Sequence, residues 1–198
     1  RNNGRRRKPR YRACSRDARI ANRVMIDSRP KSVESKRYLG DWEGDTIQGT
    51  RSGGSIATLV ERKSRFTLIL SMSSNQAGSF NTAVRTRFSL DSWLPKRTLT
   101  TDNGTEFSGH EELAKELGIA IYFARPRCSW QRGTNENTNG LIRQYFPKGT
   151  NFKTVTEDEL AKIEHRLNNR PRKTLGYRTP SEVLAFLLRR RQTVRLVT

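Results

Sequence analysis

The sequence has few acidic residues, cysteines and histidines, and it has no long apolar run. Its 198 residues include 19 Asp and Glu against 39 Lys and Arg, so the formal net charge is +20 at pH 7. A charge of this size says little about fold, but it favours polyanionic partners, and double-stranded DNA is the partner we expect. No run approaches the ~20 apolar residues of a membrane-spanning helix, so we expect no membrane partner.

The two cysteines, Cys14 and Cys128, lie far apart and form no Cys-x-x-Cys pair. This spacing argues against a zinc motif or a disulfide scaffold and favours reduced thiols in a cytoplasmic protein. His110 and His165 have no ligand spacing, and we expect both on the surface. The chain opens inside a basic run, without an initiator Met or a signal peptide, which suggests a piece of a longer protein.

Basic residues are concentrated at both ends of the chain. Residues 1–37 contain fourteen Lys and Arg against three acidic residues. We predict a basic arm or linker at 1–37, a globular core at 38–185 and a basic C-terminal tail at 186–198. Both basic ends are predicted to contact the DNA backbone.

The hydrophobic periodicity changes along the core from strand-like to helical. Three strands joined by short loops come first, and β–α alternations follow, which predicts an α/β fold with a five-stranded mixed sheet flanked by helices. That order matches the ribonuclease-H-like fold. Capping signals place helix starts at Ser108, Thr156 and Thr179, and Gly118 is a stop signal. The predicted strands are 41–48, 55–63, 66–73, 97–101 and 119–124, and the predicted helices are 76–90, 108–118, 135–146, 156–167 and 179–190.

Three acidic residues stand out in this basic chain. Asp45 lies in the first strand, Asp102 at the carboxyl end of the fourth, and Glu136 at the start of the helix after the fifth. Strand ends and the helix starts that follow them converge on one crevice of an α/β sheet. Clustered carboxylates need a cation, and hard oxygen donors suit Mg²⁺ or Mn²⁺, two of which can serve a phosphoryl displacement.

Each acid also has a purely structural interpretation. Asp102 precedes Asn-Gly, which makes a good turn by itself, and an acid in the first turn of a helix, such as Glu136, is favoured by the dipole. Asp45 competes with Asp41 and Glu43 as the relevant acid of its strand. On a helical wheel, however, Glu136 lies opposite the apolar stripe of its helix, as expected for a functional side chain.

Four stretches of the chain resemble the DDE transposases of the insertion sequence 30 family, within the retroviral-integrase superfamily. The third stretch is long and specific, and 33 residues separate Asp102 from Glu136, a spacing typical of the superfamily. The stretches are "GDWEGDTI" (40–47), "TTDNGTEF" (100–107), "CSWQRGTNENTNGLIRQYFPKGTNF" (128–152) and "LNNRPRKTLGYRTPSEV" (167–183).

The resemblance implies that Asp45, Asp102 and Glu136 are the catalytic, metal-binding triad of an integrase-type core, with Asp45 bridging two Mg²⁺ or Mn²⁺ ions. The implied activity is cleavage of transposon ends and transfer of their 3′-hydroxyls to target DNA. It further implies a homo-oligomer when two ends are paired, and a cytoplasmic, nucleoid-associated bacterial protein. The family's N-terminal recognition region has no match here, so the chain resembles the catalytic portion only.

Residues around the predicted Glu136 helix mix cations, amides and an aromatic ring. Trp130 either stacks against a base or packs over the core, whereas Trp42 is predicted to be a core residue. Two rival functions remain: a catalytically silent, transposase-derived DNA-binding protein, and a ribonuclease-H-like nuclease. The predicted DNA contacts are Arg125, Arg127, Trp130, Arg132, Asn135, Asn139, Arg143 and Lys148.

Overall fold

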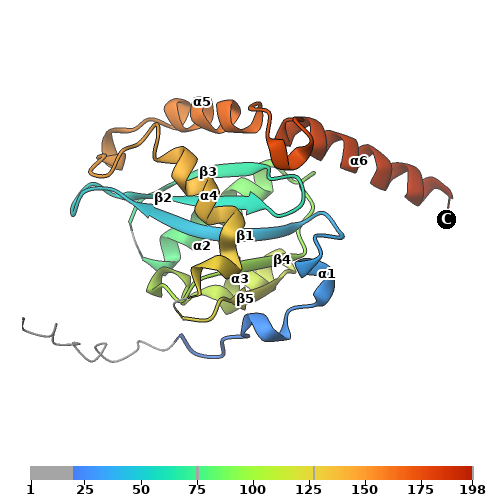
Figure 1. Cartoon of the computed structure of the whole chain (residues 1–198). Coiled ribbons are helices and arrows are strands. Elements are labelled where there is room, and N and C mark those ends of the chain that lie inside the picture. The colour runs from blue at the N-terminus through green and yellow to red at the C-terminus, as the bar shows by residue number, and fades with distance from the viewer. Residues whose placement is uncertain (1–19, 75, 127, 198) are drawn as a thin grey trace, which may run out of the picture.

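The computed structural model describes residues 20–74, 76–126 and 128–197, and it contains a five-stranded mixed sheet (Figure 1). The strand order is β3-β2-β1-β4-β5; β1 pairs with β2 and β2 with β3 in antiparallel fashion, whereas β1–β4 and β4–β5 are parallel. This sheet confirms the predicted fold class. The strands are β1 (Asp41–Gln48), β2 (Ser55–Glu61), β3 (Thr67–Met72), β4 (Thr98–Thr101) and β5 (Ala120–Phe123).

Helices cover both faces of the sheet, and the chain order explains why. The meander β1-β2-β3 needs only short turns, but a strand parallel to β1 requires a crossover, which α2 provides. Figure 1 shows α4 crossing in front of the sheet and α2 behind it. The α-helices are α1 (Lys31–Glu34), α2 (Ala77–Leu90), α3 (His110–Leu117), α4 (Gly133–Ile142), α5 (Glu157–Asn168) and α6 (Pro180–Val197).

Short 3₁₀ turns join several of these elements, and two apolar clusters fill the two sides of the sheet. Leu59 and Leu68 pack with α2 and α3 residues in the larger cluster, and Ile56 and Ile69 pack with α4 and α5 residues in the smaller one. No helix in the described ranges is long and apolar enough to cross a membrane.

The 3₁₀ turns are η1 (Ile26–Ser28), η2 (Thr105–Phe107), η3 (Ser129–Arg132), η4 (Phe152–Thr154) and η5 (Lys173–Leu175).

The edge strand β3 is closed by side chains of α5. Asn168 accepts a hydrogen bond from the Thr67 N–H and donates one to the Thr67 carbonyl, each at 2.8 Å, and Glu164 accepts from the Ile69 N–H at 2.7 Å. Unpaired edge groups invite other strands, so these contacts protect the sheet.

The segment before β1 packs against the domain. Ile20, Ile26 and Val33 are buried, and the Phe123 N–H donates to the Val24 carbonyl at 2.9 Å, beside an isolated parallel bridge from Met25. Residues 20–37 belong to the predicted basic arm or linker; the segment around Met25 lies along β5, whereas the carbonyls of Val33 and Arg37 accept from the Arg62 and Lys63 side chains after β2. Residues 1–19, the rest of the predicted arm, lie outside the described residues. At the other end, the predicted basic tail continues α6 through Val197.

Some helix ends and one histidine differ from prediction. The predicted Ser108 capping box is absent: α3 begins at His110 after Gly109, because Ser108 ends the η2 turn. His110 is buried with its ring against Phe123, so the surface prediction was wrong for this residue. α4 starts at Gly133 and ends at Ile142, four residues before the predicted end. Gly118, with φ of +63°, stops α3 as predicted.

Candidate active site

Asp45 and Asp102 lie level with each other on neighbouring strands. Glu43 in β1 is the register partner of Thr100 in the parallel strand β4. Two residues further along each chain come Asp45 and Asp102, and residues two apart point to the same face of a sheet. The parallel pairing therefore places the two carboxylates side by side, where β4 ends.

A single guanidinium joins the two carboxylates. The Arg132 Nη1 lies 3.2 Å from the Asp45 Oδ2, and its Nη2 donates to the Asp102 Oδ2 at 3.0 Å. Nη1 also donates to the Gly44 carbonyl at 3.2 Å. Arg132 ends the η3 turn just before α4, and its side chain is only 11% exposed. The two acids thus share one cation, as two neighbouring carboxylates must.

Asp102 is both a turn residue and a site residue. Its Oδ1 accepts from the Gly104 N–H at 2.9 Å, the side-chain turn that Asp-Asn-Gly favours. The next residue, Asn103, donates to the Ala124 carbonyl at 2.7 Å and accepts from Arg23. These contacts tie the loop after β4 to the chain after β5, so Asp102 is held with its other oxygen toward Arg132.

Asp45 is the more buried of the two acids. Burial raises the pKa of its carboxyl, and the nearby negative charge of Asp102 raises it further, whereas Arg132 and the Thr46 N–H lower it. Asn139 on α4 donates to the Asp45 Oδ2 at 3.0 Å. A cation bound at this carboxylate would offset the cost of keeping it ionised.

Glu136 lies on the exposed side of α4, as the helical wheel predicted. Thr134, Asn135, Thr138 and Ile142 form the buried side. Within the described ranges, however, no group of three or more His, Cys, Asp or Glu side chains lies close enough to hold a metal ion. The structure therefore brings Asp45 and Asp102 together, but it does not join Glu136 to them.

A buried carboxylate on β1 holds the first turn of α4. The Glu43 Oε2 accepts from the Asn135 N–H at 2.9 Å, and its Oε1 pairs with Arg62. Arg62 in turn donates to the Val33 carbonyl at 3.2 Å. The sequence analysis considered Glu43 only as an alternative to Asp45. The acids at 41, 43 and 45 occupy every second position, however, and this spacing indicates that they share one face of the sheet.

Several predicted DNA contacts are exposed. Trp130 is 71% exposed and does not pack over the core, whereas Trp42 is a core residue as predicted. Lys148 is exposed, and Arg125 is exposed with an ion pair to Asp27 at 2.9 Å. Of these side chains, Arg125 lines the groove beside Asp102, whereas Trp130 lines a separate groove with Asp27 and Arg29.

Other predicted contacts are engaged within the protein. Asn135 is fully buried and has no surface to offer a phosphate, which corrects the prediction for this residue. Asn139 faces Asp45, and the Arg143 Nη2 donates to the Gln48 carbonyl at 2.7 Å. Arg132 lies between the two aspartates, a position that the sequence did not predict. Arg127 lies outside the described residues.

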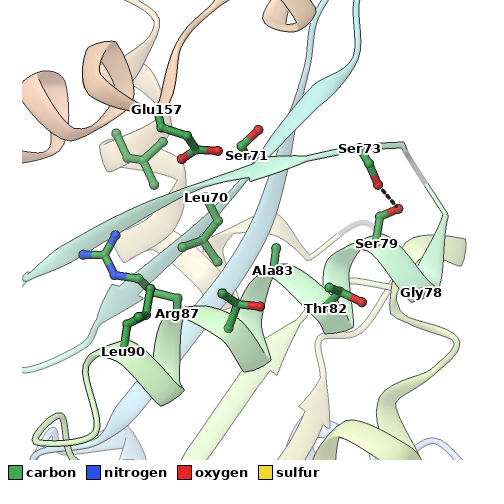
Figure 2. Close-up of a pocket in the computed structure, with 12 residues that line it drawn as sticks. Leu70, Ser71, Ser73, Gly78, Ser79, Thr82, Ala83, Arg87, Leu90 and Glu157 are labelled. Carbon is green, nitrogen blue, oxygen red and sulfur yellow. Dashed lines mark hydrogen bonds between the residues drawn. The ribbon is translucent and has the colours of Figure 1, made fainter.

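Two grooves differ in their relation to these acids. One of about 320 Å³ lies beside Asp102 and Arg132. Figure 2 shows another groove, of about 460 Å³, between α2 and the end of β3. The hydroxyl oxygens of Ser73 and Ser79 lie 3.0 Å apart there. Because β3 is separated from β1 by β2, this second groove is not part of the Asp45–Asp102 site.

Two of the three predicted ligands present donor atoms of the kind that a divalent cation takes. Asp45 and Asp102 offer carboxylate oxygens and the Gly44 carbonyl lies beside them, the hard donors that Mg²⁺ and Mn²⁺ prefer. Arg132 contacts all three groups, so a positive charge already lies between the two acids.

Comparison with known proteins identifies the domain. Residues 36–129 match the integrase core domain. A chain of the simian T-cell lymphotropic virus intasome, solved in complex with PP2A regulatory subunit B56 gamma, superposes with a TM-score of 0.58 at 17% identity, covering 73% of this chain and 53% of that one. The likeness shows a ribonuclease-H-like fold, and together these matches define an integrase-type core.

The curated relatives narrow the class to one family. Transposase InsI of IS30C from Escherichia coli K12 is 48% identical over 166 residues, covering 83% of this chain and 43% of the relative. The transposase of IS4351 from Bacteroides fragilis is 48% identical over 164 residues, covering 82% and 50%. Over more than four fifths of its length the chain is similar to these insertion-sequence transposases, and it spans about half the length of these relatives.

Proposed function

We propose that this chain is the catalytic core of a DNA transposase that cleaves transposon ends and joins their 3′-hydroxyls to target DNA. The observation that carries the proposal is the pairing of Asp45 and Asp102 where the parallel strand β4 ends, around a shared cation. Its similarity to insertion-sequence transposases and its charge of +20 support duplex DNA as the substrate.

In this proposal Asp45 and Asp102 hold the divalent ions, and Glu136 is the third ligand by family resemblance. Two Mg²⁺ or Mn²⁺ ions held there would supply Lewis acidity for the phosphoryl transfer. Asn139 and the Thr46 N–H keep the Asp45 carboxylate oriented. Arg132 neutralises the acid pair in the described state and is released toward the DNA when another cation takes its place.

The homo-oligomer that pairs two transposon ends is part of the same proposal, and the intasome likeness is consistent with it. The cytoplasmic, nucleoid-associated location stays a prediction.

The test is a strand-joining assay with pre-cut transposon-end DNA, target DNA and Mg²⁺, in the complete natural protein. We expect Asp102→Asn to abolish joining and to retain DNA binding. Asp158→Asn, a matched change on the exposed first turn of α5, should leave joining unchanged. Joining that survives Asp102→Asn would refute the assignment of the metal site.

The same assay separates the rival functions. A native protein that binds DNA but neither cuts nor joins it with Mg²⁺ or Mn²⁺ would be a silent DNA-binding protein. One that cuts the ends but never forms joined products would be a nuclease.

A further inference from the structure

A basic groove lies at the end of the sheet where β1 and β4 begin. Its volume is about 700 Å³, and it is built from the segment before β1, the turn after β2, the residue before β4, and α6. Figure 1 shows α6 extending beyond the body of the molecule at this end. The lining residues are Arg37, Tyr38, Leu39, Lys63, Arg97, Leu187, Arg190 and Arg191.

The groove brings together the two basic regions that the sequence separates by some 150 residues. Arg37 and Tyr38 come from the segment before β1, whereas Arg190 and Arg191 come from the second half of α6. Five of the eight lining residues are cations, and none of the eight is an acid. Cations that face one groove repel one another, so the arrangement favours an anionic ligand.

The wall of the groove is ordered by specific contacts. The guanidinium carbons of Arg97 and Arg37 lie 4.4 and 5.5 Å from the centre of the Tyr38 ring, which is 45% exposed. Lys63 donates to the Arg37 carbonyl at 2.7 Å. Arg97 also has a long contact, 3.5 Å, to the buried carboxylate of Asp41 below the wall. Cation–π contacts hold both arginines in place and neutralise neither, although the ion pair with Asp41 offsets part of the charge of Arg97.

The groove is distant from the Asp45–Asp102 pair. Asp41, which contacts Arg97, precedes Asp45 by four residues on β1, and Arg97 and Asp102, five residues apart, flank the two ends of β4. At ~3.3 Å per strand residue these separations are about 13 and 17 Å. A ligand in the groove therefore does not occupy the candidate active site.

We propose that this groove binds the phosphate backbone of duplex DNA, as a second contact away from the scissile bond. The proposal rests on the proposed function, because it takes DNA as the partner of the chain. Convergent Arg and Lys side chains with an exposed aromatic ring recognise phosphates without reading sequence. Such a contact adds affinity and orients the duplex, and it takes no part in the chemistry.

The test compares two double variants of the complete natural protein, each losing one Lys and one Arg. Lys63→Gln/Arg191→Gln changes the groove, and Lys162→Gln/Arg166→Gln changes the exposed side of α5. Binding of a fluorescent duplex of arbitrary sequence is measured by anisotropy over a range of NaCl concentrations.

We expect the groove variant to reduce the slope of log Kobs against log salt by about 2, since each phosphate contact contributes ~0.9. The α5 variant should keep the slope of the native protein. A charge-retaining variant, Lys63→Arg/Arg191→Lys, should keep it as well, and thermal unfolding confirms that all three are folded. Equal slope losses in the groove and α5 variants would overturn the proposal.

The outcome is separable from that of the proposed function. If the slope difference is found in a protein that cannot join DNA ends, the groove stands and the transposase chemistry fails. If joining depends on Asp102 and the groove variant keeps its slope, the chemistry stands and the groove fails.

Discussion

The Glu43–Arg62 pair gives a quantitative test of how the candidate site is held in place. The two side chains are 1% and 5% exposed, and the Glu43 carboxylate also accepts from the Asn135 N–H in the first turn of α4. The substitution Glu43→Gln keeps an oxygen for that N–H and removes only the negative charge. It therefore leaves the Arg62 guanidinium buried without its main partner.

The expected loss of stability is about 3 kcal/mol, at the lower end of the 3–5 kcal/mol typical when one partner of a buried ion pair is removed. Glu34 lies 3.8 Å from Arg62, but its side chain is 72% exposed, so solvent screens the compensation it offers. For a chain of this size the loss corresponds to a fall in Tm of about 6–12 °C.

Urea denaturation, followed by circular dichroism, measures the change. We expect a lower midpoint with an unchanged m value. Glu112→Gln on the exposed side of α3 is the matched control and should stay within about 0.5 kcal/mol of the native protein. Adding Arg62→Met to Glu43→Gln should recover much of the loss, because it removes the stranded charge.

A loss below about 1 kcal/mol for Glu43→Gln, or no recovery in the double variant, would refute the reasoning. We also expect Glu43→Gln to reduce DNA joining at temperatures where the protein is still folded, because a neutral amide oxygen holds the Asn135 N–H, in the turn of α4 that carries Glu136, less strongly than a carboxylate does.

Other predictions test the scaffold. Gly40→Ala should lower the free energy of unfolding by about 1–3 kcal/mol in a urea titration, since Gly40 has φ of +98° and a Cβ would lie 2.9 Å from the Pro95 carbonyl. Asn168→Ala leaves the Thr67 edge groups unpaired and should cost a similar amount, with faster amide exchange at Thr67. Burial raises the pKa of Glu164. The stability that this side chain contributes is therefore present below its unfolded pKa of about 4.3 and is lost as the pH rises through its folded pKa. The native protein should therefore lose stability relative to Glu164→Gln across that window, and a constant difference would contradict the assignment.

The sheet and the aspartate pair could be predicted because their signals are local. Alternating apolar residues and the Gly53-Gly54 turn define the meander, and parallel strands place Asp45 beside Asp102 once the order is known. The capping box at Thr156 is present for the same reason.

The rest depends on contacts between distant segments. Arg132 reaches the two acids only because the η3 turn folds back over β1, and no spacing encodes that. The segment before β1 is strongly basic and has no apolar periodicity, so its sequence did not indicate that three of its apolar residues are buried. These are Ile20, Ile26 and Val33. Asn135 is buried against the sheet, where its N–H donates to Glu43, 92 residues earlier, and its side chain accepts from Thr58.

The closed edges of the sheet limit how copies of this chain can assemble. At β3 the Thr67 and Ile69 N–H groups are taken by α5, and at β5 the Phe123 N–H is taken by the segment around Met25. A second copy cannot add its strand at these positions without first removing contacts that belong to the same chain. At these described edge positions, contacts between copies of this chain would therefore use helix faces or the DNA itself rather than a shared sheet.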